Sequence, residues 1–111
     1  MLLREKSCSP LKDIPPLDEQ QASSLLSQLD QQWQLSEDHK SISFDFQFNN
    51  FHETMSFVNA LAWIAHQQDH HPELEVSYKH CLVHYSTHSV DGLSENDFIC
   101  AAKIERLVLQ T

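Results

Sequence analysis

The stretch that decides the fold is residues 66–97, which reads HQQDHHPELEVSYKHCLVHYSTHSVDGLSEND. Six of the eight histidines in the chain fall within it. They gather at two places where the chain changes from one element to another, just before Pro72 and just before Gly92. Because imidazoles can be placed anywhere on a polar surface, their clustering at element boundaries predicts a functional site.

Proline explains the first of these boundaries. Pro72 disfavours the α conformation in the residue before it, so the preceding helix should end by His70 and His71 should be extended. The two adjacent imidazoles then point in different directions, and the one at the helix end meets carbonyl dipoles that favour a cation. His88 ends a strand-like run over residues 81–87. If that strand lies beside the helix end, all three histidines could meet over one pocket.

Three helices are predicted from their starts and their apolar periodicity. Each start carries a capping pair at a three-residue spacing: Asp18 with Gln21, Asn50 with Glu53, and Ser94 with Asp97. The first helix should run to about Asp30. The stripes expected to be buried are Leu25, Leu26 and Leu29 in the first helix, Phe51, Met55, Val58, Leu61, Ala62 and Ala65 in the second, and Cys100, Ala101, Ile104 and Val108 in the third. Capping alone accounts for Asp97.

Two hairpins of strands separate the helices. The first pairs residues 33–37 with residues 41–48, where apolar and polar side chains alternate with the period of a sheet that has one buried face. The second runs from Pro72 through the alternating Leu74 and Val76 and returns along residues 81–87. These elements predict an α+β fold, a four-stranded antiparallel sheet with helices packed on one face in the order α-β-β-α-β-β-α.

Composition and charge limit the possible domain organisation, partners and location of the chain. Residues 1–16 hold three of the four prolines and no hydrophobic period, so we expect an extended, solvated arm before a single domain over residues 17–111. The net charge of −9 and the lack of a basic stripe argue against nucleic acid and anionic membranes as partners. The opening lacks the apolar segment of a secretory signal, which predicts a cytoplasmic location. Cys8, Cys81 and Cys100 lack CxxC spacing and are expected to be free thiols.

A set of separated residues resembles the pterin-4a-carbinolamine dehydratases. The matching residues are His70-His71-Pro72, Tyr78, Thr87-His88, Gly92-Leu93-Ser94 and Asp97. The resemblance covers residues from about 18 to 107 and implies the same α+β fold. It also implies the reaction, the loss of water from a 4a-hydroxytetrahydropterin to give the quinonoid dihydropterin, with no metal or redox cofactor.

The resemblance assigns roles to particular residues. It places His70, His71 and His88 at the catalytic centre, with His70 and His88 as acid and base in an order left open. His71 and Asp69 are expected to contact the pterin or orient an imidazole. Substrate contacts are also expected from Thr87 and His66. Histidine suits both proton transfers because its pKa lies near working pH. Tyr78 is expected to pack beneath the site.

The family also implies partners. A homodimer or homotetramer is expected, since assembly would cover the open edges of the sheet. An aromatic amino acid hydroxylase would supply the carbinolamine, so functional coupling to such an enzyme is expected. The chain departs from the family pattern at His66, where many relatives have Glu, and at Ser89, where the residue is often acidic. These departures affect the expected rate and the tuning of His70.

Two alternatives of other classes stay open. His66 and His70 lie one helical turn apart and, with His71 or His88, could form a three-histidine zinc or nickel site. The spacing lacks the glutamate of HExxH, which weakens this reading. The third possibility is a non-catalytic dimerisation or interaction partner built on the same fold, because some relatives of the family serve as partners of a transcription factor.

Overall fold

The structure is a computed structural model and describes residues 1–109, so the last two residues of the domain predicted over 17–111 lie outside the described residues. The elements, in chain order, are η1 (Leu3–Glu5), α1 (Glu19–Leu26), β1 (Gln34–Leu35), β2 (Ile42–Gln47), α2 (Phe51–Gln68), β3 (Glu73–Val76), β4 (His80–Tyr85), η2 (His88–Val90) and α3 (Glu95–Glu105). The predicted α+β order is confirmed, although α1 ends before Asp30.

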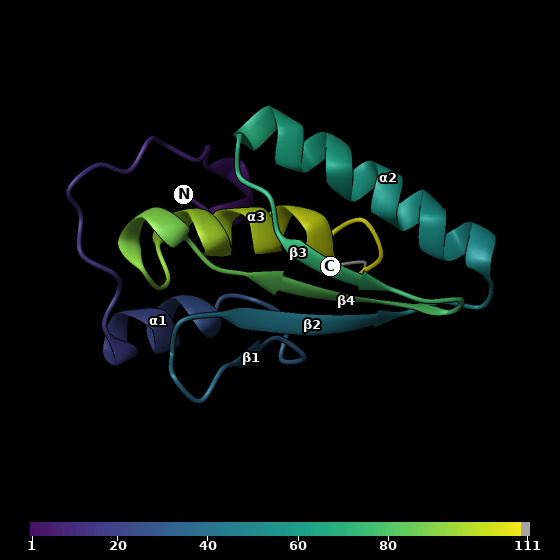
Figure 1. The fold of residues 1–111 in the computed structure, drawn as a ribbon, viewed down its shortest axis with the longest axis horizontal. Coiled ribbons are helices and arrows are strands. Elements are labelled where there is room, and N and C mark those ends of the chain that lie inside the picture. Colours follow the sequence, from purple (N-terminus) through teal and green to yellow (C-terminus); the bar gives the residue numbers. More distant parts are fainter. Residues whose placement is uncertain (110–111) are drawn as a thin grey trace.

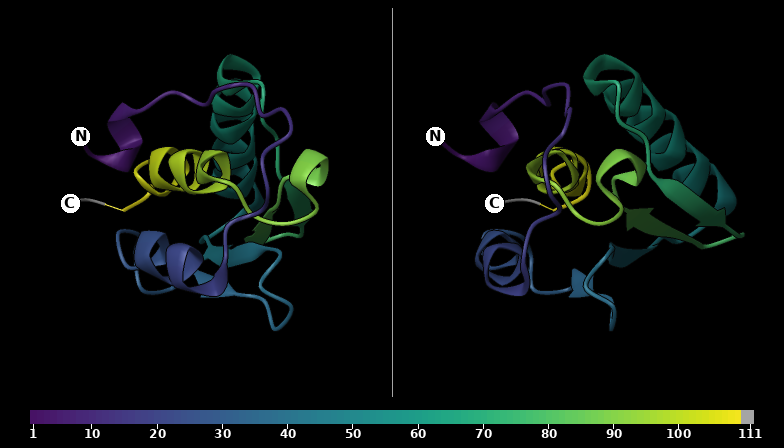
Figure 2. Two further views of the ribbon diagram at one scale, coloured as in Figure 1. Left: turned by 90° about the vertical axis from the view of Figure 1, so that its left-hand side faces the viewer. Right: turned by 60° about the vertical axis from the view of Figure 1, so that its left-hand side comes forward.

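The four strands form one antiparallel sheet in the order β1-β2-β4-β3. The central pair is β2 with β4, in a register that runs from Ile42 opposite Tyr85 to Gln47 opposite His80. Helices α2 and α3 lie over one face of this sheet, and α1 lies beside α3 close to β1 (Figures 1 and 2). The β1 and β3 strands are therefore the two edges of the sheet.

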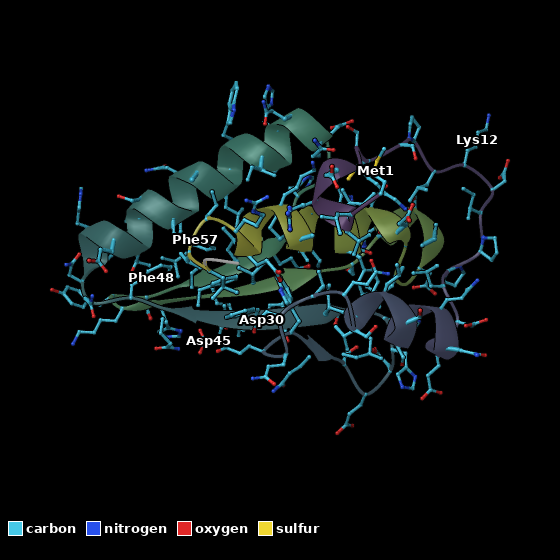
Figure 3. The ribbon with its side chains drawn as sticks, turned by 180° about the vertical axis from the view of Figure 1, so that it is seen from behind. Met1, Lys12, Asp30, Asp45, Phe48 and Phe57 are labelled. Carbon is cyan, nitrogen blue, oxygen red and sulfur yellow. The ribbon has the colours of Figure 1, made fainter. Side chains whose placement is uncertain are left out.

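The alternation predicted for β2 separates core from solvent. Ile42, Phe44 and Phe46 are buried, whereas Asp45 is exposed. Figure 3 shows Phe57 of α2 between that helix and the sheet, with Asp45 on the opposite side of the strands. The rings of Phe44 and Phe46 are stacked with centroids 3.8 Å apart. The aromatic row is thus the main packing surface that holds the helices on the sheet.

The caps predicted for the helices are present, but the buried face of α2 differs from the prediction. The side chain of Asn50 accepts a hydrogen bond from the Glu53 N–H, as expected. The buried side chains of α2 are Thr54, Phe57, Leu61 and Ala65. Leu61 and Ala65 are buried as predicted, whereas Thr54 and Phe57 take the buried positions expected for Met55 and Val58, and Phe51 and Ala62 are exposed. Burial of Thr54 is possible because its hydroxyl lies within hydrogen-bond distance of two backbone carbonyls, those of Asn50 and Tyr78, which share its one proton.

The N-terminal arm packs against the domain, which corrects the expectation of a solvated leader. Leu3 is buried within the hydrophobic core, and η1 packs against α3. In Figure 3 the arm returns to solvent around Lys12. At the other end of the chain, Val108 is exposed because α3 ends at Glu105, so it does not join the buried stripe that we predicted. No helix within residues 1–109 is both long and apolar enough to cross a bilayer.

Candidate functional site

The end of α2 sets the direction of the histidine pair. Asp69 closes the helix in the left-handed conformation, with φ of 52°, and its N–H donates back to the carbonyls of Ala65 and His66. The next N–H, that of His70, also returns to the Ala65 carbonyl at 3.1 Å. This double return is the hydrogen-bond pattern of a helix C-terminus that reverses direction. The turn carries His70 toward α3 and leaves His71 exposed.

The His70 ring is held by a buried carboxylate. Its Nε2 atom lies 2.7 Å from Asp97 Oδ1, and the two side chains are 13% and 0% exposed. Because a carboxylate can only accept, Nε2 carries a proton, and in the neutral ring the free electron pair is on Nδ1. Burial alone would lower the pKa of His70, but the hydrogen bond and the charge of Asp97 outweigh it and raise the pKa above 6.5.

Asp97 serves two purposes at once. Its Oδ2 atom accepts the Ser94 N–H at 3.0 Å, which is the predicted cap of α3, and the Thr87 hydroxyl at 2.7 Å. Its Oδ1 atom meets His70. Sequence reasoning explained Asp97 by capping alone and missed this second contact, because the partner lies 27 residues away. The shared carboxylate connects His70 to Thr87, and His88 follows Thr87 in the chain.

An aromatic ring does pack beneath the site, but it is not the one we expected. Tyr85, which is fully buried, stacks on the His70 ring with centroids 5.8 Å apart and an interplanar angle of 9°. Tyr78 is 61% exposed and stacks instead on Phe51 at the N-terminus of α2. The expectation for Tyr78 was wrong because β3 ends at Val76, so the alternation of the strand does not extend to it.

An open cleft of about 370 Å³ lies beside β4 and η2. Thr87 and His88 line it, and so do His84 and Glu75, whose side chains lie 3.1 Å apart. Its size is within the range of small-molecule sites. Sequence analysis assigned no role to His84. The available signal was its place on the strand that leads into Thr87 and His88.

The cleft does not include every predicted site residue. His66 is exposed on α2, with its ring 5.8 Å from that of Trp63. His66, Asp69, His70 and His71 are absent from the residues that line the cleft. The structure therefore joins His70 to Thr87 through Asp97, and opens Thr87 and His88 to the cleft. It leaves His66, Asp69 and His71 exposed near the end of α2.

A metal site was the first alternative. Within residues 1–109, no group of three His, Cys, Asp or Glu side chains is close enough to hold a metal ion. His66 lies beside Trp63 with the two rings tilted, while His70 contacts Asp97, so the predicted three-histidine set is not assembled in this structure. What the arrangement can do chemically is move protons, through an imidazole whose tautomer is set by a buried carboxylate.

The fold and the site define a small α+β protein with a histidine and aspartate pair beside an open cleft. Residues 15–107 match the family described as pterin 4 alpha carbinolamine dehydratase. The chain belongs to the pterin 4 alpha carbinolamine dehydratase family, whose named activity, a dehydration, is that of a hydro-lyase. The resemblance noted from the sequence is confirmed, and the family indicates dehydratase activity on a pterin carbinolamine.

Relatives match over almost the full chain. A protein of Nitrosomonas eutropha, named provisionally as a pterin-4-alpha-carbinolamine dehydratase, is 50% identical over 108 residues, which are 96% of this chain and 94% of the relative. A protein of the same provisional name from Legionella pneumophila is 49% identical over 108 residues, 96% of each chain.

Solved structures show the same fold. The crystal structure of a transcriptional coactivator/pterin dehydratase from Brucella melitensis has a TM-score of 0.79 and 32% identity, and covers 83% of this chain and 97% of that one. A pterin dehydratase-like protein identified as a RuBisCO assembly factor in the alpha-carboxysome has a TM-score of 0.64 at 17% identity. The match covers 74% of this chain and 95% of that chain. At this identity the similarity shows a shared fold and nothing about function.

Proposed function

We propose that the protein dehydrates a 4a-hydroxytetrahydropterin to the quinonoid dihydropterin by histidine acid–base catalysis. The observation that carries the proposal is the 2.7 Å contact between His70 Nε2 and the buried Asp97 carboxylate. A ring fixed in this way presents Nδ1 as its reactive atom. Family membership supplies the reaction class, and the pair supplies a group able to hold and release a proton near neutral pH.

The reaction requires two proton movements and no change of oxidation state. One group protonates the hydroxyl that leaves C4a, another removes the proton from N5, and the N5 lone pair helps to expel water. His70 and His88 are proposed for these two tasks, with the order left open, and His71 is proposed to hold the pterin. Each transfer is typically worth about 10²- to 10⁴-fold in rate.

The polar character of the cleft agrees with an uncharged heterocycle. Glu73 and Glu75 line it, as does Asp91, which is paired with Lys40 at 3.3 Å. A lining rich in carboxylates repels phosphate and other anions, and its oxygens can accept hydrogen bonds from the ring N–H groups and the amino group of a pterin. Thr87 at the cleft wall, and His66 and Asp69 at the helix end, remain proposed substrate contacts.

The test follows the decay of the carbinolamine. A phenylalanine hydroxylase generates 4a-hydroxytetrahydropterin in place, and absorbance reports its decay with this protein, with His71→Ala and with His88→Ala. His52→Ala is the matched control, because His52 is exposed at the opposite end of α2. We expect the wild-type protein and His52→Ala to accelerate the decay and the two site variants to lose most of the acceleration. No acceleration by the folded wild-type protein would contradict the proposal.

Self-association is proposed as the state in which the protein acts. The β3 strand is an edge of the sheet, and large apolar side chains are exposed there and on α2, with Val76 at 41% and Trp63 at 61%. Exposed apolar surface next to an open edge is typical of an interface. Sedimentation of the wild-type protein should give a dimer or tetramer, and Trp63→Lys should shift it toward monomer. A monomeric wild-type protein at micromolar concentration would contradict this assembly.

Coupling to an aromatic amino acid hydroxylase belongs to the same proposal, because such an enzyme releases the carbinolamine as its pterin product. The protein would then return the pterin to the reducible quinonoid form. The expected result is that adding the protein to a hydroxylase reaction shortens the lifetime of the carbinolamine in proportion to the protein present. A carbinolamine lifetime that does not change when the protein is added would contradict coupling between this protein and the hydroxylase.

A further inference from the structure

The N-terminal arm is attached to α3 by charge and by packing. Lys6 Nζ lies 2.8 Å from Glu95 Oε2, and Lys103 Nζ donates to the Arg4 carbonyl at 3.0 Å. Leu3 is buried against the same helix. These contacts come from both ends of α3, so the arm runs along the helix, as Figure 1 shows.

The arm is positioned most closely around Cys8. The Cys8 N–H donates to Gln68 Oε1 at 2.7 Å. The next residue, Ser9, exchanges two hydrogen bonds with the Asn96 side chain, at 3.2 and 2.9 Å. The backbone is therefore held at Cys8 and immediately after it, by α2 on one side and α3 on the other.

This arrangement puts two sulfur atoms in contact. Cys8 Sγ lies 3.5 Å from Cys100 Sγ. Cys100 is fully buried in α3, whereas Cys8 is half-buried and can be reached from solvent. A disulfide has a sulfur–sulfur distance of about 2.05 Å, so the two atoms have to approach by about 1.5 Å, which rotation of the half-buried Cys8 side chain can provide.

The two thiols differ in acidity, and this difference assigns their roles. The hydrogen bond from Cys100 lowers the pKa of Cys8, and the nearby His70 and Lys103 charges act in the same direction against burial. The Cys8 contact and burial raise the pKa of Cys100. Burial raises the pKa of Cys81, the third thiol, to about 11. Because the thiolate is the reactive form, Cys8 is the thiol that reacts first.

We propose that Cys8 and Cys100 form an oxidisable pair, a modification site at which hydrogen peroxide converts the two thiols into a disulfide. The Cys8 sulfur attacks the peroxide and becomes a sulfenic acid while the peroxide O–O bond breaks and one water leaves. The Cys100 sulfur then displaces the hydroxyl as a second water and the S–S bond forms. Two thiols supply the two electrons that reduce one peroxide.

The disulfide would lie directly behind the His70 site. Cys100 is three residues after Asp97 on α3, and its Sγ is 3.9 Å from the His70 carbonyl oxygen. Joining Cys8 to Cys100 converts the non-covalent attachment of the arm into a covalent one. The closed loop spans nearly the whole chain, so the oxidised form has a strongly restricted unfolded state.

The experiment treats the full-length protein with hydrogen peroxide, removes the peroxide, unfolds the protein in denaturant that already contains excess N-ethylmaleimide so that buried thiols are blocked as they become exposed, and maps the peptides by mass spectrometry. We expect reactive thiols to fall from three to one, a mass loss of about 2 Da, and one cross-linked peptide containing Cys8 and Cys100. Dithiothreitol should reverse all three changes. The melting temperature should rise by roughly 10 °C on oxidation.

Two variants serve as controls. Cys8→Ser should retain two free thiols after peroxide and show no rise in melting temperature, whereas Cys81→Ala should still form the cross-link. If Cys81→Ala fails to fold, the peptide map of the wild-type protein decides alone. Three free thiols after peroxide, or Cys8 oxidised to a sulfinic acid with Cys100 still free, would overturn the proposal, as would a cross-link that joins either residue to Cys81.

Discussion

Replacing Asp97 by Asn tests how the His70 ring is controlled. Asp97 is fully buried and accepts hydrogen bonds from Thr87, Ser94 and His70. If the Asn side-chain oxygen takes the Oδ2 position, it can still accept the hydrogen bonds of Thr87 and Ser94. The amide NH₂ then takes the Oδ1 position and faces His70 Nε2. Two donors cannot face each other, so the neutral ring has to move its proton to Nδ1. The free electron pair proposed to face the substrate is thereby lost.

The size of the effect follows from the contacts. One charge-assisted hydrogen bond inside the protein is lost while the α3 cap survives, so the free energy of unfolding should fall by about 1–3 kcal/mol. The pKa of His70 should fall, because burial then acts without the opposing carboxylate. The dehydratase rate should fall by about 10²- to 10⁴-fold, as expected when a general acid or base is lost.

The loss of stability in Asp97→Asn should depend on pH. The folded-state pKa of His70 is raised above 6.5, so the stability that its charged form contributes is complete below about pH 6.5 and is lost as pH rises through the raised value. Asp97→Asn should therefore cost more stability at pH 5.5 than at pH 8.5.

Urea unfolding at both pH values, with ¹⁵N NMR of the His70 ring, measures the cost, the pKa and the tautomer. Glu95→Gln is the charge control, because Glu95 is an exposed acid on the same turn of α3 and should cost little. An equal loss of stability at both pH values with an unchanged His70 pKa would show that Asp97 does not control the His70 ring.

Two further predictions concern buried acceptors. Thr87→Val should reduce the free energy of unfolding by about 1–3 kcal/mol, because Asp97 then lacks one of its donors, whereas Thr87→Ser should cost less. A loss for Thr87→Ser in urea unfolding that equals or exceeds the loss for Thr87→Val would contradict the importance of the hydroxyl. Burial raises the pKa of Glu105, although its Oε1 accepts the Trp33 indole N–H at 3.0 Å. Glu105→Gln keeps that acceptor, so it should match or exceed wild-type stability at pH 7, with a gain that shrinks as pH falls through the raised pKa. A clear loss of stability at pH 7 would contradict the burial cost.

Much of the fold could be predicted because it depends on local signals. Side-chain caps lie three residues from their targets, and the alternation in β2 reports directly which face is buried. The first half of the α2 stripe differs from the prediction by one position, because Thr54, a polar residue, is buried with its hydroxyl bonded to carbonyls of Asn50 and Tyr78. The spacing of apolar residues cannot predict that a polar residue such as Thr54 is buried.

The parts of the site that could not be predicted depend on long-range contacts. The contact between His70 and Asp97 joins the end of α2 to the start of α3, and nothing local distinguishes it from ordinary capping. The ring of Tyr85 lies beneath His70 because β4 places it on the helix-covered face. The arm was expected to be solvated because its composition does not reveal that Leu3 fills a gap in the core.

The most direct test of the central claim compares the wild-type protein with His70→Gln in the decay of 4a-hydroxytetrahydropterin. Glutamine can still hydrogen-bond to Asp97 but cannot exchange a proton near neutral pH. We expect the variant to fold with the wild-type circular dichroism spectrum and to lose about 10²- to 10⁴-fold of the dehydration rate. A folded His70→Gln protein that dehydrates the carbinolamine at the wild-type rate would contradict the central claim.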